Sequence, residues 1–469
     1  MRTAKAIVAA MLVAGCMLAY HGYLHGAAGA VPGLLTQFIQ SFPSSFLPGL
    51  PGSALYPSLL SAQTATIDWE DVHQTIDGFG GSCADFVRPL TSSQAKFFFT
   101  VSGIGLSLLR TQIVPDAATC NAYFESGGCT NSNGQSLNGE LETARQAVAL
   151  GATVWSAPWS PPGIYKSNAT FTNGGYLLST HYSDWAARIA QYVTMMAAHG
   201  VPIYAVSVQN EPDISAAYGS CTYTGRQIHD FVPFLHSALQ SAGVGATRIM
   251  IAEESQWNVD LASNTMADLN VAPAVGILAA HGYGGAKIQQ FGSQGVRLWQ
   301  TEDSSQSPTY DGSIIDGLMW AKKIHSYLTV ANVNAWHWWF LSNMEGHGFG
   351  TDNSALTDIN GNYPKRAYVT GQWSKFVRPG WVRIGARHSG KLQISAFKDL
   401  HSARFAIVVV NSGSAASLAL SLHGFSPTAV EPWITSATLS LAAQPSVSIH
   451  GRAFTYMLAG SSVTTFNGQ

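Results

Sequence analysis

The 469-residue chain is poor in charge and in long apolar runs. Charged residues make up 11% of it, well below the roughly 25% of an average soluble protein. With a net charge of −2 and no cluster of Lys and Arg, it offers no basic surface for nucleic acid. We therefore expect no nucleic-acid partner. Beyond the N-terminal segment no apolar run approaches the ~20 residues of a membrane-spanning helix, so no transmembrane span is expected in the mature chain.

Cysteine is also scarce. The chain has 5 cysteines, and the four outside the N-terminal segment are Cys83, Cys120, Cys129 and Cys221. They are too few and too scattered for a disulfide scaffold or a zinc cluster. Cys120 and Cys129 flank a Gly/Ser/Asn-rich stretch and could close a loop in an oxidising compartment. The acidic and His-containing tract 345–347 lacks partners at zinc spacing, so we expect neither a metal nor a cofactor.

The N-terminus has the features of an export signal. Arg2 and Lys5 precede an apolar run over residues 6–20, and a small-residue sequence follows at 28–30, which together predict a signal peptide over residues 1–30. The mature protein would then be secreted or periplasmic. An alternative stays open, because residues 13–16 (VAGC) resemble a lipoprotein processing box. Cleavage there would leave a lipid-anchored Cys16 at the start of a cell-surface lipoprotein.

The rest of the chain changes character along its length. Residues 31–63 are rich in Pro, Ser, Gly and Leu and predict a linker. Across 78–378, apolar β-type runs alternate with helix-compatible stretches, which is typical of βαβ units and a parallel sheet. Eight such runs predict a closed (β/α)8 TIM barrel; they are 78–86, 104–110, 153–159, 203–209, 249–253, 276–281, 296–302 and 333–339.

The last part of the chain predicts a second, all-β unit. Residues 379–469 contain short alternating strands separated by Gly/Ser/Asn turns, as in a C-terminal antiparallel β-sandwich side domain. The strand-like segment 64–77 precedes the barrel and is expected to join this sandwich. The fold class is therefore α/β, with a barrel and a discontinuous side domain.

Two carboxylates stand at matched positions of the predicted barrel. Glu211 follows the fourth run and Glu302 ends the seventh. The C-terminal ends of barrel strands carry the active site, so these two side chains would face one another across its mouth. Paired carboxylates are what glycoside hydrolysis needs, and their separation decides the stereochemical outcome. Singly, each would more often be a solvated strand-end acid. Glu253 and Glu254, after the fifth run, are expected to be structural.

Six collinear motifs resemble glycoside hydrolase family 30, of the clan A retaining β-glycosidases. They are 74–81 (QTIDGFGG), 156–162 (SAPWSPP), 207–212 (SVQNEP), 299–302 (WQTE), 336–339 (WHWW) and 365–380 (KRAYVTGQWSKFVRPG). The resemblance spans about residues 70–469. It implies a double displacement with Glu211 as general acid/base and Glu302 as nucleophile. It also implies that Arg110 lies near the nucleophile and that Asn210 binds the sugar 2-hydroxyl.

Aromatic and imidazole side chains at or just past the ends of the runs are expected to contact the sugar, since aromatic faces stack on pyranose rings. They are Trp159, His281, Tyr283, Trp336 and Trp338. For each of them a place in the buried core is the open alternative. Arg110 could likewise be a buried salt-bridge partner.

Within the family the bacterial xylanase-like branch is the most similar, ahead of the glucosylceramidase and endo-β-1,6-galactanase relatives. Glucuronate-dependent xylanases carry an arginine in the loop after the eighth strand, but residues 340–363 contain no Arg or Lys. The resemblance favours a xylan-like substrate, and the missing arginine puts dependence on glucuronate in doubt. An unsubstituted xylan, a β-1,6-galactan, a β-1,6-glucan or a small β-glycoside stays open. An alternative of another class is a non-catalytic carbohydrate-binding protein, against which both glutamates argue. Endo or exo action and oligomeric state are not predicted.

Overall fold

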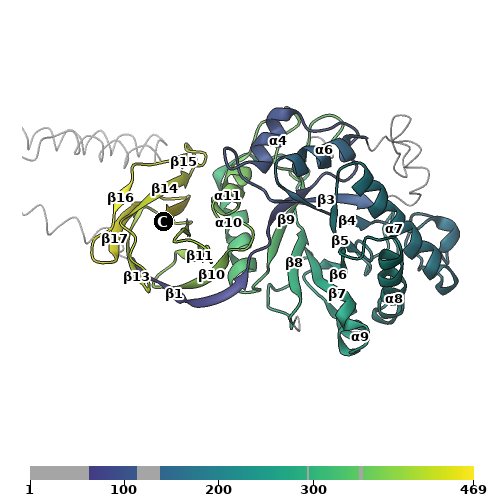
Figure 1. Ribbon diagram of the computed structural model, residues 1–469. Helices are drawn as coiled ribbons and strands as arrows, with labels where there is room; N and C mark the ends of the chain where they lie inside the picture. The colour runs from purple at the N-terminus through teal and green to yellow at the C-terminus, as the bar shows by residue number, and fades with distance from the viewer. Residues whose placement is uncertain (1–62, 114–137, 293–294, 348–351) are drawn as a thin grey trace, which may run out of the picture. The chain divides into compact units, whose positions relative to one another are not determined.

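The computed structural model describes residues 63–113, 138–292, 295–347 and 352–469 (Figure 1). The predicted signal, the Cys16 anchor and the loop between Cys120 and Cys129 lie outside the described residues. Within them, Cys83 and Cys221 are free and buried. None of the helices in these ranges combines the length and apolar character needed to cross a membrane.

Eight parallel strands form a closed barrel in chain order, with the last strand paired to the first (Figure 1). The strands are β2 (Gly78–Ser82), β3 (Leu108–Ile113), β4 (Thr153–Pro158), β5 (Ile203–Ser207), β6 (Arg248–Gln256), β7 (Val275–Tyr283), β8 (Arg297–Glu302) and β9 (Ala335–Phe340). This confirms the predicted fold class.

Alternation of side chains along these strands gives the barrel two separate cores. One fills the interior, where Trp155, Met250 and Trp299 are buried together. The interior also holds His337, whose Nε2 lies 3.0 Å from Trp155 Nε1 and accepts its hydrogen bond. Burial lowers the pKa of His337 to about 3, so the ring is neutral. Gly80 is required opposite it, since a Cβ there would lie 2.5 Å from His337 Cδ2.

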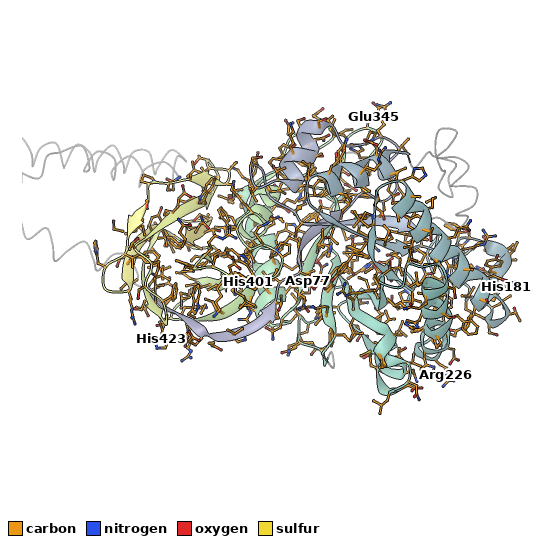
Figure 2. All side chains as sticks on the ribbon, viewed as in Figure 1. Asp77, His181, Arg226, Glu345, His401 and His423 are labelled. Atoms are coloured by element: carbon orange, nitrogen blue, oxygen red, sulfur yellow. The ribbon has the colours of Figure 1, made fainter. Side chains whose placement is uncertain are left out.

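The N-terminal end of the barrel is closed by polar contacts away from the predicted site. Asp77, labelled in Figure 2, directly precedes β2, and its carboxylate accepts a hydrogen bond from Trp299 Nε1 at 2.8 Å. It also lies 3.6 Å from Arg297 Nε. Burial raises the pKa of Asp77 despite these partners. We therefore expect the active site at the opposite, C-terminal end of the barrel.

Amphipathic helices connect the strands and provide the outer core. α7 buries Trp185, Ile189 and Val193 at helical spacing, and Thr224 begins α8 with a capping box to Gln227. The helices are α4 (Ser92–Phe99), α6 (Asn138–Ala149), α7 (Tyr182–Ala198), α8 (Gly225–Ser241), α9 (Ser263–Ala267), α10 (Ile314–Thr329) and α11 (Lys365–Ser374).

The second strand differs from its prediction. It begins at Leu108 rather than residue 104 and extends to Ile113. Gly105 has a φ of +71°, a left-handed conformation that breaks the extended run ahead of the strand. Arg110 therefore lies inside β3 instead of ending it, and its side chain is fully buried.

A ten-stranded sheet forms the second unit, and its strands enclose a separate apolar core that includes Ile67, Ile407 and Phe466. β1 precedes the barrel but pairs with β10, antiparallel, and with β13, parallel (Figure 1). The strands are β1 (Gln63–Thr75), β10 (Val382–His388), β11 (Gln393–Lys398), β12 (Phe405–Asn411), β13 (Ala416–His423), β14 (Ala429–Thr435), β15 (Ala442–Ala443), β16 (Val447–Ser448), β17 (Ala453–Leu458) and β18 (Ser462–Gly468).

Candidate active site

The chain turns sharply after β5 and thereby aims Glu211 into the barrel mouth. Asn210 N–H donates to Pro158 O at 2.9 Å, and Glu211 N–H donates to Glu253 O at 3.1 Å. Glu211 adopts a φ of +49°, which costs a non-glycine residue conformational energy and persists only where its surroundings enforce it. The backbone at this position is fixed by neighbouring strands on both sides.

Glu302, the last residue of β8, is held by two side chains from other strands. Tyr283 donates its hydroxyl to Glu302 Oε1 at 2.8 Å, and Arg110 Nη1 donates to Glu302 Oε2. Arg110 Nη2 also donates to Asn210 Oδ1 at 2.5 Å and to Glu253 Oε1 at 2.8 Å. The Arg110 guanidinium thus links Asn210, which precedes Glu211, to Glu302.

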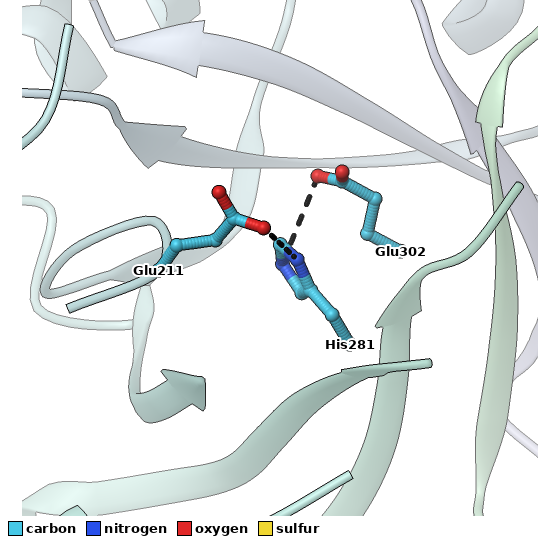
Figure 3. Close-up of side chains that lie close together, drawn as sticks. All are labelled: Glu211, His281 and Glu302. Atoms are coloured by element: carbon cyan, nitrogen blue, oxygen red, sulfur yellow. Dashed lines mark hydrogen bonds and ion pairs between the residues drawn. The ribbon is translucent and has the colours of Figure 1, made fainter. Parts of the chain in front are cut away.

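The two predicted catalytic carboxylates face one another at close range. One oxygen of Glu211 and one of Glu302 lie within 4.8 Å of each other, and both lie that close to a nitrogen of His281. Figure 3 shows the imidazole beside both carboxylates, with Glu211 and Glu302 approaching from opposite sides of the view. Both acids are nearly buried, with exposed fractions of 7% and 6%.

The sequence predicted that His281 contacts the sugar, and this prediction is wrong. Its side chain is fully buried, with Nδ1 3.2 Å from Glu211 Oε1 and Nε2 3.7 Å from Glu302 Oε2 (Figure 3). Burial acts to lower the pKa of His281, but the charges and hydrogen bonds of Glu302, Glu211 and Glu253 outweigh it and raise the pKa to about 10. The ring is an imidazolium beneath the pocket, where no sugar can stack on it.

The same contacts set the charge state of Glu211. Burial alone would raise its pKa, but the hydrogen bond and charge of His281, the Tyr218 hydroxyl and the Arg110 charge together lower it. Without a substrate Glu211 is therefore ionised at neutral pH.

Tyr218 is a contact that the sequence did not predict. It lies in the loop after Glu211, is 50% exposed, and donates its hydroxyl to Glu211 Oε2 at 2.5 Å. Burial and the Glu211 charge raise the pKa of Tyr218, so the hydroxyl keeps its proton and acts as a donor. Neither periodicity nor a motif marks a tyrosine in an irregular loop, so its sequence gave no signal.

A pocket of about 900 Å³ covers the carboxylate pair, a size typical of small-molecule and saccharide sites. Its charged lining is entirely acidic among the described residues. The lining includes Asp85, Gln112, Trp159, Phe171, Asn210, Glu211, Tyr218, Tyr283, Glu302, Ser304, Gln306, Trp339, Asp352 and Ser354. Of the predicted sugar contacts, Trp159, Asn210 and Tyr283 lie in this pocket.

The prediction for Trp336 and Trp338 is wrong. Both are fully buried against Trp320 of α10, and Trp338 Nε1 donates to Ser354 O at 2.7 Å. Strand alternation turns them outward, whereas Trp339 turns inward, where its ring centroid lies 5.8 Å from that of Trp159. The pocket platform is therefore Trp159 with Trp339.

Glu211, His281 and Glu302 are also the kinds of side chain that bind metal ions. Their donor atoms are already engaged, however, by Tyr218, Tyr283 and Arg110. A cation bound there would sit against a guanidinium and an imidazolium. The donor set therefore does not fit a divalent metal, and we assign it none.

A parallel (β/α)8 barrel with two facing carboxylates under a polar and aromatic pocket has the architecture of a barrel glycoside hydrolase. Residues 139–303 match the model of the glycosyl hydrolase family 30 TIM-barrel domain. The chain is a glycoside hydrolase, and its barrel is similar to those of family 30.

Individual relatives agree with this assignment. The chain is 28% identical to glucuronoxylanase XynC of Bacillus subtilis (strain 168), over 87% of this chain and 92% of that one. The crystal structure of the family 30 subfamily 8 xylanase Xyn30A from Clostridium acetobutylicum superimposes with a TM-score of 0.75 at 29% identity, covering 87% of this chain and 99% of that one. An endo-1,6-beta-D-glucanase of Neurospora crassa is 27% identical over 30% of this chain and 34% of its own length.

Proposed function

We propose that the protein is a retaining β-glycoside hydrolase that works by double displacement, with Glu302 as nucleophile and Glu211 as general acid/base. The observation that carries this proposal is the approach of their carboxylate oxygens to within 4.8 Å. Retaining enzymes place the two carboxyl groups about 5–5.5 Å apart, whereas inverting enzymes leave about 6.5–9.5 Å for a water molecule. The close approach here favours the retaining geometry.

In the first step Glu302 attacks the anomeric carbon, the bond to the leaving oxygen breaks, and Glu211 gives that oxygen a proton. In the second step Glu211 takes a proton from water, whose oxygen attacks the anomeric carbon and releases the Glu302 carboxylate. Arg110 and Tyr283 hold Glu302 in place for the attack. Asn210, fixed by Arg110 and exposed to the pocket, is placed to meet the sugar hydroxyl beside the anomeric carbon.

The charge state of the site suits this cycle once a substrate is bound. A sugar that covers Glu211 excludes water and raises its pKa, so that the acid gains its proton while ionised Glu302 stays beside it. In the glycosyl-enzyme Glu302 is an uncharged ester, and the loss of that neighbouring charge lowers the pKa of Glu211 again. The residue is then the base that the second step needs.

We infer that the substrate is xylan, cleaved at stretches that carry no acidic substituent. Two relatives that match over most of the chain are named a glucuronoxylanase and a xylanase. Asp85 and Asp352 lie in the lining together with both glutamates, and no Lys or Arg does among the described residues. A glucuronate carboxylate would meet repulsion there.

Hydrolysis assays test both parts. Wild type and Glu302→Gln are incubated with unsubstituted xylan, glucuronoxylan, β-1,6-glucan and β-1,6-galactan, and released reducing sugar is measured. Wild type should release sugar fastest from unsubstituted xylan, and Glu302→Gln should release none above background. Binding of xylan by wild type without any release would instead support the carbohydrate-binding alternative, and faster release from β-1,6-glucan would overturn the choice of substrate.

We also propose that the chain is exported, because its substrate is an extracellular polymer and its first 30 residues have the pattern of a signal peptide. N-terminal sequencing of protein from the native host should begin near residue 31. A fatty-acylated Cys16 would support the lipoprotein alternative, and an intact Met1 would contradict export.

A further inference from the structure

We propose that Glu253 is a positioning residue whose fixed negative charge lets Glu211 carry a proton while Glu302 stays ionised. The inference rests on the proposed function, because it assigns roles to both carboxylates. Glu253, which ends the predicted run 249–253 and lies within β6, was expected from the sequence to be only a structural acid, and it forms no part of the pocket lining.

A bulge in β6 brings Glu253 into the site. Ala252 pairs with Ala279 and Glu254 pairs with Ala280, so Glu253 is an extra residue without its own partner in the ladder. Ala252 and Glu253 have φ angles of +69° and +54°. Such bulges redirect a side chain next to active sites, and two consecutive left-handed residues without glycine cost energy that a merely structural acid would not require.

Glu253 contacts both halves of the catalytic machinery. Its Oε1 accepts from Arg110 Nη2 at 2.8 Å and lies 3.5 Å from His281 Nε2. Its backbone oxygen accepts from Glu211 N–H. Arg110 in turn holds Glu302, and His281 contacts Glu211. One residue thus fixes the two cations that face the two catalytic carboxylates.

The charge count of this buried cluster explains why a third carboxylate is needed. Arg110 and His281 supply two positive charges, which Glu253 and Glu302 balance when Glu211 is protonated. Without Glu253 the cluster would be neutral only with both catalytic carboxylates ionised, and no acid would remain. Glu253 is fully buried, and its Oε2 has no hydrogen-bond partner among the described residues. A buried carboxylate with one oxygen unpaired lowers the stability of the fold, so stability alone does not account for it.

Other ionisable groups around His281 do not replace Glu253. Asp303 follows Glu302 and is buried, but it is paired with Lys323 Nζ at 2.5 Å. Glu254 points the other way, with its Oε1 accepting from Leu261 N–H at 2.8 Å. Among the residues that the structure describes, the charged groups within 4 Å of His281 are Glu211, Glu253 and Glu302.

The test compares three variants by the pH profile of kcat/KM on xylan. In Glu253→Gln the two cations act undivided on the catalytic carboxylates, so Glu211 loses its proton at lower pH. The alkaline limb should move down by about one pH unit, because a negative charge 3.5 Å from His281 no longer offsets the imidazolium that contacts Glu211. KM should change less than about twofold, and kcat at the new optimum should fall up to about tenfold through lost positioning.

Glu254→Gln is the matched control, because it makes the same substitution at the adjacent acid, whose side chain contacts Leu261 N–H and not the site. Its profile should coincide with that of wild type. Glu253→Asp keeps the charge and should keep the alkaline limb, with kcat lowered because the shorter side chain reaches Arg110 poorly. Circular dichroism shows whether Glu253→Gln folds. If it does not, the position of the alkaline limb in Glu253→Asp still tests the proposal.

An unshifted alkaline limb in folded Glu253→Gln, or a shifted one in Glu253→Asp, would overturn the proposal. The proposed function fails by a different result, namely residual activity in Glu302→Gln. Loss of activity in Glu253→Gln at every pH, with the Glu253→Asp limb unchanged, would indicate that the charge is required even more strictly and would support the proposal.

Discussion

Removal of the Tyr218 hydroxyl tests how the pKa of the general acid is set. Tyr218→Phe deletes one donor to Glu211 Oε2 and leaves the ring in place. A hydrogen bond to a charged group contributes about 1.5–3 kcal/mol, and since Tyr218 is 50% exposed we take about 1 kcal/mol after solvent screening. At about 1.4 kcal/mol per pKa unit, this predicts a rise of roughly 0.7 units in the pKa of Glu211.

The sign follows from the direction of the contact. The hydroxyl stabilises ionised Glu211 and lowers its pKa, so Glu211 in Tyr218→Phe holds its proton to higher pH. The alkaline limb of kcat/KM should move up by about half to one pH unit, opposite to the shift expected for Glu253→Gln. Tyr176→Phe is the control, because Tyr176 is similarly exposed at 47% and lies outside the pocket lining. A limb that stays put or moves down in Tyr218→Phe would refute the reasoning.

Three further perturbations follow from the same geometry. Trp339→Ala removes one face of the platform and should raise KM about tenfold or more, since the burial of one large apolar side chain contributes about 1.5–3 kcal/mol. Trp338→Phe changes a ring outside the pocket lining, and it should lower the thermal midpoint and leave KM unchanged. Arg110→Met leaves buried carboxylates without their partner and should lower the free energy of unfolding in urea by about 3–5 kcal/mol. It should also reduce kcat/KM at least about a hundredfold, because Glu302 is no longer held in place. A stable, active variant would contradict the proposed role of these ion pairs. The pKa of His281 in the folded protein is about 10, above its ordinary value of 6.5. Its contribution to stability is therefore complete below about pH 6.5 and is lost as pH rises towards 10. The urea midpoint should fall over that pH range, and it should fall less steeply in His281→Asn.

The fold and the carboxylate pair could be predicted because both depend on regular patterns. Eight apolar runs separated by helical stretches define the barrel, and its strand ends bring Glu211 and Glu302 to one mouth. Their catalytic roles stay predictions, although the structure places them at the spacing that the chemistry needs. The predicted limits of the second strand were wrong because Gly105, in a left-handed conformation, breaks the extended run that the sequence suggested.

The parts that could not be predicted depend on irregular backbone. Strict alternation along β6 from the inward Met250 would place Ala252 and Glu254 inside, and only the bulge at Glu253 reverses this. Trp339 was different, because the alternation from the inward Ala335 through His337 already points to it rather than to its neighbours. The alternation of side chains along this strand was readable from the sequence, but the prediction followed the aromatic character of Trp336 and Trp338 instead.

The stereochemistry of the first product tests the central claim most directly. Proton NMR of a β-xylosidic substrate, recorded within the first minutes of hydrolysis, distinguishes the two anomers before mutarotation mixes them. The close approach of Glu211 and Glu302 predicts that the β-anomer is released first and that the α-anomer grows in later. Initial release of the α-anomer would contradict the double displacement and the assignment of Glu302 as nucleophile.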